Sequence, residues 1–327
     1  MSLVIVSDSL RGLPPAVAEA ERSGHALEWV DGLVPFPEVA ARGLADLSAA
    51  EGIVTGRVMR VDRAALDLCP RLRVLALHTS GSDNVDLGEA TARGVVVTTV
   101  KGVNAEACAE LSIGLMLAVA RKIVVGDKAI REGLWASRTQ ESMDLLGATL
   151  GVVGLGGIGR AAVRRAAAFG MRLLCHTRTP DEPFAAEHGV AYVDLDTLLR
   201  ESDVVSLYAS LNPSTAGMIG AREIALMKEG AILVNVARGE LVDEAALTEA
   251  VRWGRITGAG LDVFVQEPLL DSPLFALDNV VLTPHQAGLT AGAKRAAAVR
   301  AVRNALAGLR GERPPDALNP QAMELWA

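Results

Sequence analysis

Three residues in the second half of this 327-residue chain have side chains that together could reduce or oxidise a carbon–oxygen bond. Arg238, Glu267 and His285 each come just after a short apolar run that is typical of a buried strand. Arginine offers a permanent charge with paired donors, and histidine exchanges a proton near neutral pH. We predict that Arg238 holds a substrate carboxylate or polarises a carbonyl. We predict that His285 gives or takes the proton while Glu267 orients its ring and favours the imidazolium.

A glycine-rich segment precedes all three residues. Residues 154–159 read Gly-Leu-Gly-Gly-Ile-Gly, after a strand-like segment and at the start of a helical one. In that context the first glycine allows a tight turn, the second lets backbone approach a pyrophosphate, and the third lets helix and strand pack closely. Backbone amides at the helix N-terminus would meet the negative charge. The residues predicted to bind the dinucleotide here are Gly154, Gly156, Gly157, Ile158 and Gly159. A turn of this composition without a ligand is the alternative.

The segment after the next predicted strand, residues 172–175, lacks the acidic residue typical of NAD-binding proteins. In those proteins an acid bonds the adenosine ribose hydroxyls at this point. Here Thr177 and Arg178 follow instead, and a hydroxyl with a guanidinium suits a 2′-phosphate. We predict that the chain prefers NADP(H). NAD(H) is the alternative if Asp181 or Glu182 turns toward the ribose.

The composition is typical of a soluble globular protein, with 50% hydrophobic and 22% charged residues. The formal charge of −7, from 32 basic and 39 acidic residues, leaves no basic patch for nucleic acid. The N-terminus has no basic segment, and the most apolar stretch, residues 111–120, is about half a membrane span, so we expect neither signal peptide nor membrane contact. Cys69, Cys108 and Cys175 lack metal-ligand spacing. We expect buried, reduced thiols in a cytoplasmic protein and no metal site.

Short apolar runs alternate with helical patterns throughout, as in parallel α/β proteins. The runs form two series, so we predict two α/β domains, each with its own core. The first series of predicted strands comprises residues 3–6, 27–30, 53–55, 74–77 and 95–97. The second comprises residues 150–153, 172–175, 191–193, 204–207, 232–236, 257–261 and 280–282. Ligands collect at the carboxyl ends of parallel strands, so Arg238, Glu267 and His285 should converge beside the glycine loop.

Two long predicted helices, residues 104–124 and 291–309, mark the crossings between the domains. Asn104 and Thr290 are suitable N-caps for them. Because the last helix can return to the first domain, we predict that this domain is discontinuous. The predicted domains are a substrate domain of residues 1–100 with 289–327, and a dinucleotide-binding domain of residues 101–288.

The ordered set of motifs resembles the D-2-hydroxyacid dehydrogenase family over essentially the whole chain. The matching segments are Asn235-Val236-Ala237-Arg238-Gly239, Leu261-Asp262-Val263-Phe264 with Glu267-Pro268, Thr283-Pro284-His285, Ser82-Asp83-Asn84-Val85-Asp86, and Asn104 through Ala109-Glu110. The resemblance implies two Rossmann-like, doubly wound domains separated by a cleft, one flavodoxin-like and one binding NAD(P). It also implies hydride transfer between nicotinamide and C2 of a 2-oxo or 2-hydroxy acid. Homodimers joined through the nucleotide-binding domains are common in the family, and residues 111–120 with the loop around Trp135 are our candidate contact surface.

The resemblance also assigns cofactor contacts that the residue pattern does not. It places Asp262 near the nicotinamide carboxamide, Ala237 and Cys108 near the ring, and Pro213 on the adenine side.

Substrate contacts are implied for the backbone of Ser80 and Gly81, which would meet the substrate carboxylate. Many family members have Val-Gly at this point, and Lys101 stands where a neutral residue is common. Both departures add polar groups, which favours a small polar 2-oxo acid such as glyoxylate or hydroxypyruvate. An exposed lysine at the domain crossing is the alternative interpretation of Lys101.

Two other functions remain open from the sequence. One is oxidation of phosphite or another acid on the same fold; formate is disfavoured because formate dehydrogenases of this fold have Gln where Glu267 stands. The other is a non-enzymatic, NAD(H)-sensing scaffold resembling the C-terminal binding corepressors, which share the Arg, Glu and His.

Overall fold

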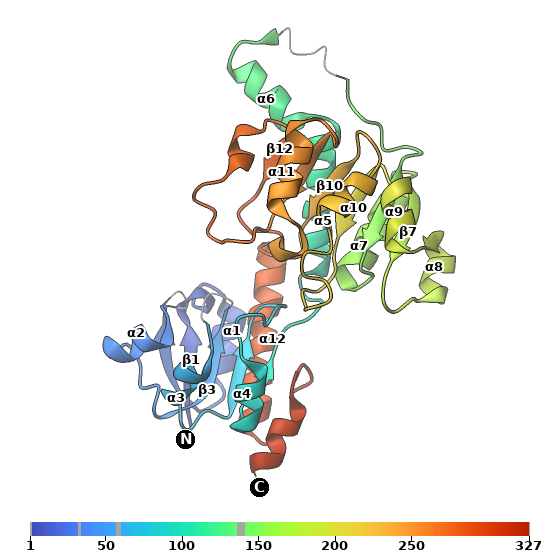
Figure 1. The fold of residues 1–327 in the computed structure, drawn as a ribbon. Coiled ribbons are helices and arrows are strands. Elements are labelled where there is room, and N and C mark those ends of the chain that lie inside the picture. The colour runs from blue at the N-terminus through green and yellow to red at the C-terminus, as the bar shows by residue number, and fades with distance from the viewer. Residues whose placement is uncertain (1, 32–33, 57–59, 136–140, 327) are drawn as a thin grey trace. The chain divides into compact units, whose positions relative to one another are not determined.

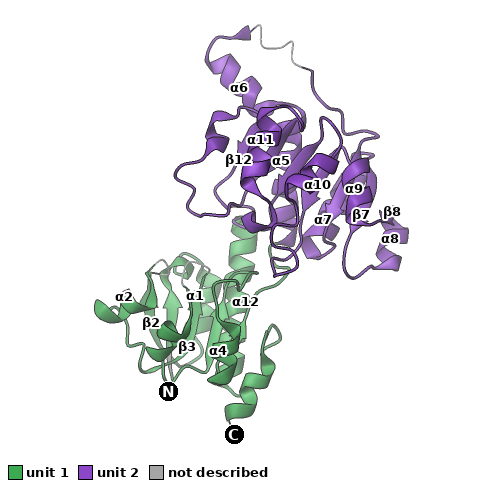
Figure 2. Cartoon of the chain, viewed as in Figure 1, with its two compact units in different colours: residues 1–104, 290–327 green, residues 105–289 purple. Residues whose placement is uncertain are grey.

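The computed structural model describes residues 2–31, 34–56, 60–135 and 141–326. The chain divides into two compact units, Met1–Asn104 with Thr290–Ala327, and Ala105–Leu289 (Figure 2). Each unit contains one parallel sheet with helices on both of its faces (Figure 1). The predicted fold class, two doubly wound α/β sheets, is confirmed.

The first unit is built on a sheet with strand order β2-β1-β3-β4-β5. This is the flavodoxin-like order. Its strands are β1 (Leu3–Ser7), β2 (Ala26–Val30), β3 (Ala50–Thr55), β4 (Val74–Leu77) and β5 (Val96–Thr98). Its helices are α1 (Pro14–Glu21), α2 (Phe36–Ala41), α3 (Arg63–Asp67), α4 (Leu87–Ala92) and α12 (Ala291–Leu309), with short 3-10 helices η1 (Asp8–Leu10) and η5 (Pro320–Trp326). Each of the five strands predicted for this series overlaps an observed one.

Helix α12 closes one face of this sheet. Its buried residues Ala298, Ala301 and Ala305 recur at helical spacing and belong to the same apolar cluster as Val74 of β4. Thr290 caps the helix by accepting a hydrogen bond from the backbone of Ala293, at 3.2 Å, as predicted. Helix α12 therefore packs on the first sheet, although it lies far from the strands of that sheet in the sequence.

The second unit is built on a sheet with strand order β12-β11-β10-β9-β6-β7-β8. The chain order reverses around β6, and such reversals are where open α/β sheets bind ligands. Its strands are β6 (Thr149–Val153), β7 (Arg172–His176), β8 (Val190–Tyr192), β9 (Val204–Leu207), β10 (Ile232–Asn235), β11 (Gly258–Leu261) and β12 (Val280–Leu282). Its helices are α5 (Ala105–Ala120), α6 (Ile123–Arg131), α7 (Gly157–Ala168), α8 (Glu182–His188), α9 (Leu195–Glu201), α10 (Ala221–Leu226) and α11 (Glu244–Arg252), with 3-10 helices η3 (Gly239–Leu241) and η4 (Pro273–Ala276).

The single helix predicted over residues 104–124 is wrong, because two helices occupy this region. Helix α5 ends at Ala120, and α6 begins after Lys122, whose φ of 52° is left-handed and cannot continue an α-helix. Helix α5 is buried against the sheet, where a β-carbon on Gly260 would lie 2.8 Å from the β-carbon of Leu115.

Within the described ranges, the structure contains no helix with the length and apolar character needed to cross a membrane.

Candidate active site

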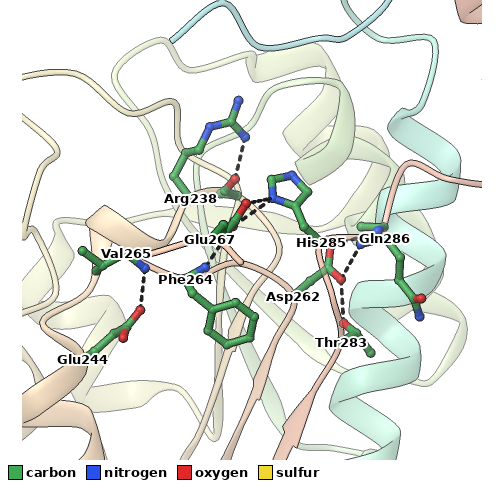
Figure 3. Close-up of polar contacts among 11 residues, drawn as sticks. Arg238, Glu244, Asp262, Phe264, Val265, Glu267, Thr283, His285 and Gln286 are labelled. Atoms are coloured by element: carbon green, nitrogen blue, oxygen red, sulfur yellow. Dashed lines mark hydrogen bonds and ion pairs between the residues drawn. The ribbon is translucent and has the colours of Figure 1, made fainter. Parts of the chain in front are cut away.

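Strands β10, β11 and β12 end level with one another in the second unit. Asn235 pairs with Leu261, and Leu261 pairs with Leu282. The loops that follow these residues therefore leave the sheet at the same edge. They carry Arg238, Glu267 and His285, which lie together in Figure 3.

The structure brings the carboxylate of Glu267 against the ring of His285. The imidazole Nδ1 lies 2.8 Å from Glu267 Oε2 and 2.9 Å from Oε1 (Figure 3). An ionised carboxylate only accepts hydrogen bonds, so Nδ1 carries the hydrogen. The Phe264 amide donates to Glu267 Oε1 at 3.1 Å, which ties the carboxylate to its own loop. The two side chains are 32% and 25% exposed, so the pair is partly shielded yet reachable.

The backbone of His285 has a conformation that histidine rarely adopts. Its φ is 48°, in the left-handed region, which costs on the order of 1–3 kcal/mol and needs support from its surroundings. Asp262 is fully buried and accepts hydrogen bonds from both sides of His285: from Thr283 Oγ1 at 2.6 Å, and from the amides of Gln286 and Ala287 at 2.9 Å each. The Asp262 carboxylate thus fixes the loop that carries the histidine. Its predicted contact with the nicotinamide carboxamide stays a prediction.

Arg238 stands on a turn that the buried side chain of Asn235 organises. Asn235 Oδ1 accepts from the Ala237 amide at 3.0 Å, and its Nδ2 donates to the Arg238 carbonyl at 2.8 Å. The guanidinium Nη1 of Arg238 donates to the Ala237 carbonyl at 2.7 Å. A β-carbon on Gly239 would lie 2.0 Å from the carbonyl carbon of Phe264, so only glycine lets this turn pack against the loop after β11. The sequence pattern alone assigns no role to Asn235, although a polar residue at the end of an apolar run is a signal for one.

The glycine loop has the shape that a dinucleotide requires. Gly154 has a φ of 98°, and a β-carbon there would lie 2.8 Å from the Ala209 nitrogen. A β-carbon on Gly159 would lie 2.2 Å from the Gly154 carbonyl oxygen, so turn and helix touch. A β-carbon on Gly156, the N-cap of α7, would meet no protein atom within 4 Å. The helix N-terminus is therefore open where a phosphate would approach, and the loop fits a bound pyrophosphate.

The other predicted cofactor residues also lie in the second unit. Thr177 and Arg178 follow β7, and Pro213 is an exposed residue after β9, so both segments flank the strand that leads into the glycine loop. Ala237 and Cys108 are buried, at 7% and 4% exposed.

The three cysteines are unpaired and buried. Burial raises the pKa of the Cys108 thiol to about 12. The charge of Asp262 also raises this pKa, and the charge of Arg238 lowers it. Cys108 is therefore close enough to feel both charges. Among the residues whose placement the structure gives, no group of three or more His, Cys, Asp or Glu side chains could hold a metal ion.

Ser80 and Gly81 lie in the first unit, after β4. The Ser80 hydroxyl donates to Asn104 Oδ1 at 2.8 Å, at the last residue before the second unit begins. Thr79 Oγ1 donates to the Gly81 carbonyl at 3.0 Å. Lys101 is exposed on the same connection. Their roles toward a substrate stay predictions.

Comparison with known proteins gives a consistent result. The sequence model of the D-isomer specific 2-hydroxyacid dehydrogenase NAD binding domain matches residues 113–287. A glyoxylate reductase from Korarchaeum cryptofilum is 41% identical over 302 residues, covering 91% of this chain and 90% of its own. The crystal structure of a protein from Thermus thermophilus has a TM-score of 0.85 and 40% identity, covering 97% of this chain and 99% of that one. A glyoxylate reductase from Paecilomyes thermophila has a TM-score of 0.86 and 31% identity, covering 98% and 99%.

Proposed function

This chain belongs to the D-isomer-specific 2-hydroxyacid dehydrogenase family, and we propose that it reduces glyoxylate, hydroxypyruvate or a similarly small 2-oxo acid, with NADPH as its preferred reductant. Reduction of a 2-oxo acid with a nicotinamide cofactor is the activity of this family. The comparisons do not favour the scaffold or the phosphite alternative.

The observation that carries the proposal is the His285–Glu267 pair beside Arg238 at one sheet edge. A bound nicotinamide supplies the hydride that reaches the substrate carbon. As the substrate oxygen gains negative charge it needs a proton, and His285 gives it from Nε2, since Nδ1 is committed to Glu267. Glu267 holds the ring in that orientation through its contacts with Nδ1. Arg238 binds the substrate carboxylate or polarises the carbonyl with its paired donors.

The proposed substrate class rests on the relatives and on the chemistry of the site. Curated relatives about 40% identical to this chain are named glyoxylate reductases. Arg238 offers a cation to a carboxylate, and Ser80 adds a hydroxyl where many family members have an apolar side chain. A short acid with polar substituents suits such groups.

The proposed preference for NADPH rests on the segment after β7. Thr177 is half-buried and Arg178 is exposed, and neither residue is acidic. The Arg178 guanidinium makes no hydrogen bond or ion pair with any residue that the structure describes. It is therefore available for a 2′-phosphate.

A homodimer remains part of the proposal, but we now propose a different contact surface for it. Residues 111–120 are mostly buried in the core of their own unit, so they offer little surface to a second copy. Helix α6 projects from the unit (Figure 1), and Ile123 and Ile130 on it are each 55% exposed. Trp135 is 68% exposed, and residues 136–140 of the predicted contact loop lie outside the described residues. Apolar surface of this kind favours association.

A cytoplasmic location is also proposed. It is supported by the three unpaired cysteines, Cys69, Cys108 and Cys175, which an oxidising compartment would expose to disulfide formation during folding.

A panel of 2-oxo acids, each assayed with NADPH and with NADH, tests the proposal. We expect the highest kcat/KM with glyoxylate or hydroxypyruvate and NADPH. A higher kcat/KM with NADH would refute the cofactor preference, and a higher value with a bulky oxo acid would refute the substrate class. No turnover with any oxo acid would revive the scaffold alternative.

A further inference from the structure

The acid closest in sequence to the end of β7 is tightly held. Asp181 lies five residues beyond His176, the last residue of the strand. The Tyr192 hydroxyl, from β8, accepts from the Asp181 amide at 2.7 Å and donates to its carbonyl at 2.9 Å. The Asp181 carboxylate caps α8 by accepting from the Phe184 amide at 3.1 Å. Backbone and side chain are both fixed.

The second carboxylate oxygen of Asp181 is bound by a residue of α7, the helix that begins in the glycine loop. Arg160, in the first turn of α7, donates from Nη1 to Asp181 Oδ2 at 2.6 Å. The Arg160 guanidinium also stacks over the Phe184 ring, 4.8 Å from its centre. The two side chains are about equally covered, at 33% and 32% exposed. This contact joins the start of α7 to the loop after β7. In a dinucleotide-binding sheet the adenosine ribose lies between these two elements.

The charged side chains at this edge therefore differ in whether they have an ion-pair partner. Asp181 is neutralised by Arg160, whereas Arg178 has no ion pair in the part of the chain that the structure describes. Glu182, the next acid, is exposed and makes no ion pair with a described residue. A phosphate dianion would meet the unpaired cation and would not meet the full charge of Asp181.

We propose that Arg160 determines cofactor specificity by binding Asp181, which keeps that carboxylate from bonding a ribose hydroxyl and from repelling a 2′-phosphate. The proposal rests on the proposed NADPH preference. Arg160 acts through Asp181 and is a positioning residue, because the side-chain hydrogen bond that the structure gives it, from Nη1, goes to the carboxylate.

A double-mutant cycle tests the proposal, with dissociation constants for NADP⁺ and NAD⁺ measured by titration calorimetry on the full chain. Arg160→Met keeps an apolar stem against Phe184 and removes the charge. We expect it to weaken NADP⁺ binding on the order of tenfold, the effect of one uncompensated like charge at short range, and to leave NAD⁺ binding equal or stronger. Asp181→Asn keeps the α8 cap, because Asn is as good an N-cap as Asp. It should leave NADP⁺ binding unchanged or slightly stronger.

The double variant Arg160→Met with Asp181→Asn decides between an indirect and a direct role. If Arg160 acts through Asp181, the double variant regains the NADP⁺ affinity of Asp181→Asn alone. If Arg160 contacts the phosphate itself, affinity stays low in the double variant, and the proposal is overturned. It is also overturned if Arg160→Met leaves the ratio of the two dissociation constants unchanged.

Two controls separate this inference from the function on which it rests. Glu182→Gln removes a neighbouring acid that has no described ion pair, and it should not change the ratio. Arg178→Met should weaken NADP⁺ binding whatever residue stands at 181, and a failure there refutes the proposed phosphate site alone. If the parent protein binds NAD⁺ as tightly as NADP⁺, the proposed preference is wrong, while a shift caused by Arg160→Met still supports the role of Arg160.

Discussion

Two pairs of a carboxylate with a nitrogen base lie at the carboxyl edge of the second sheet, and they are similar in distance and exposure. His285 and Glu267 are 2.8 Å apart with side chains 32% and 25% exposed, and Arg160 and Asp181 are 2.6 Å apart with side chains 33% and 32% exposed. The difference lies in the cation. An imidazole exchanges a proton near neutral pH, whereas a guanidinium stays charged. One pair can therefore deliver a proton, and the other can only fix a charge.

The supports of the two pairs differ as well. His285 is itself a loop residue with left-handed backbone, and the buried Asp262 binds the residues on both sides of it. Arg160 stands on a regular helix, and Asp181 is an ordinary helix cap. The first loop adopts an unfavourable backbone conformation to aim one ring, whereas the second pair forms from elements in favourable conformations. Distance and exposure alone would not distinguish a pair that can exchange a proton from one that cannot.

The largest expected effect comes from removing the imidazole. His285→Ala should lower kcat for glyoxylate reduction by about 10²–10⁴, because the proposed proton donor is lost. Asn tolerates left-handed backbone, so His285→Asn should fold normally and show the same loss. Steady-state kinetics gives kcat, and quenching of protein fluorescence gives the dissociation constant of NADPH, which should change little. Turnover close to that of the parent protein in both variants would overturn the assignment of His285.

A smaller effect is expected from the partner of the ring. Glu267→Gln keeps the size of the side chain and removes the charge that orients His285, so we expect kcat to fall by about 10², as for a misplaced catalytic group. The matched change in the other pair, Asp181→Asn, should leave kcat with saturating NADPH unchanged. Equal losses of kcat in the two variants would show that the pairs do not differ in function.

The loop support should give a smaller loss that also affects stability. Thr283→Val removes the hydroxyl that donates to Asp262 at 2.6 Å, and a hydrogen bond to a charged group is worth about 1.5–3 kcal/mol. We expect a lower urea midpoint and a reduction of kcat of less than about tenfold, because the two backbone donors to Asp262 remain. Thr283→Ser keeps the hydroxyl and should behave as the parent protein. An unchanged midpoint in Thr283→Val would contradict the support role of Asp262.

The smallest expected effect is an absence of pH dependence in cofactor choice. The Phe184 amide, and after it the Arg160 guanidinium, hold the pKa of Asp181 below its usual 3.8, so this carboxylate stays ionised at neutral and alkaline pH. Its stabilising effect on folding is present above its unfolded pKa and is lost only as pH falls through the lowered folded value. Between about pH 7.5 and 9 a 2′-phosphate is also mainly a dianion. The ratio of NADP⁺ to NAD⁺ dissociation constants should therefore stay constant over this range in calorimetric titrations, and a drift would point to another titrating group.

The sequence by itself determined the features that depend on local patterns. Alternating apolar runs gave both series of strands, and the glycine spacing gave the turn before α7, because backbone conformation and close packing there depend on residues a few positions apart. The level ends of β10 to β12 follow from parallel pairing, so Arg238, Glu267 and His285 could be expected together.

Only the tertiary structure decided how distant side chains divide among partners. The Arg160–Asp181 pair spans 21 positions and forms because α7 and the loop after β7 meet, which no periodicity records. The left-handed conformation of Lys122 divides α5 from α6, and the apolar pattern of residues 104–124 did not reveal this turn. The contacts of Asp262 depend on a loop folding back over the end of β11, more than twenty residues along the chain. Hydrogen bonds and ion pairs act over a few Å, so they are settled only when packing has fixed which elements are neighbours.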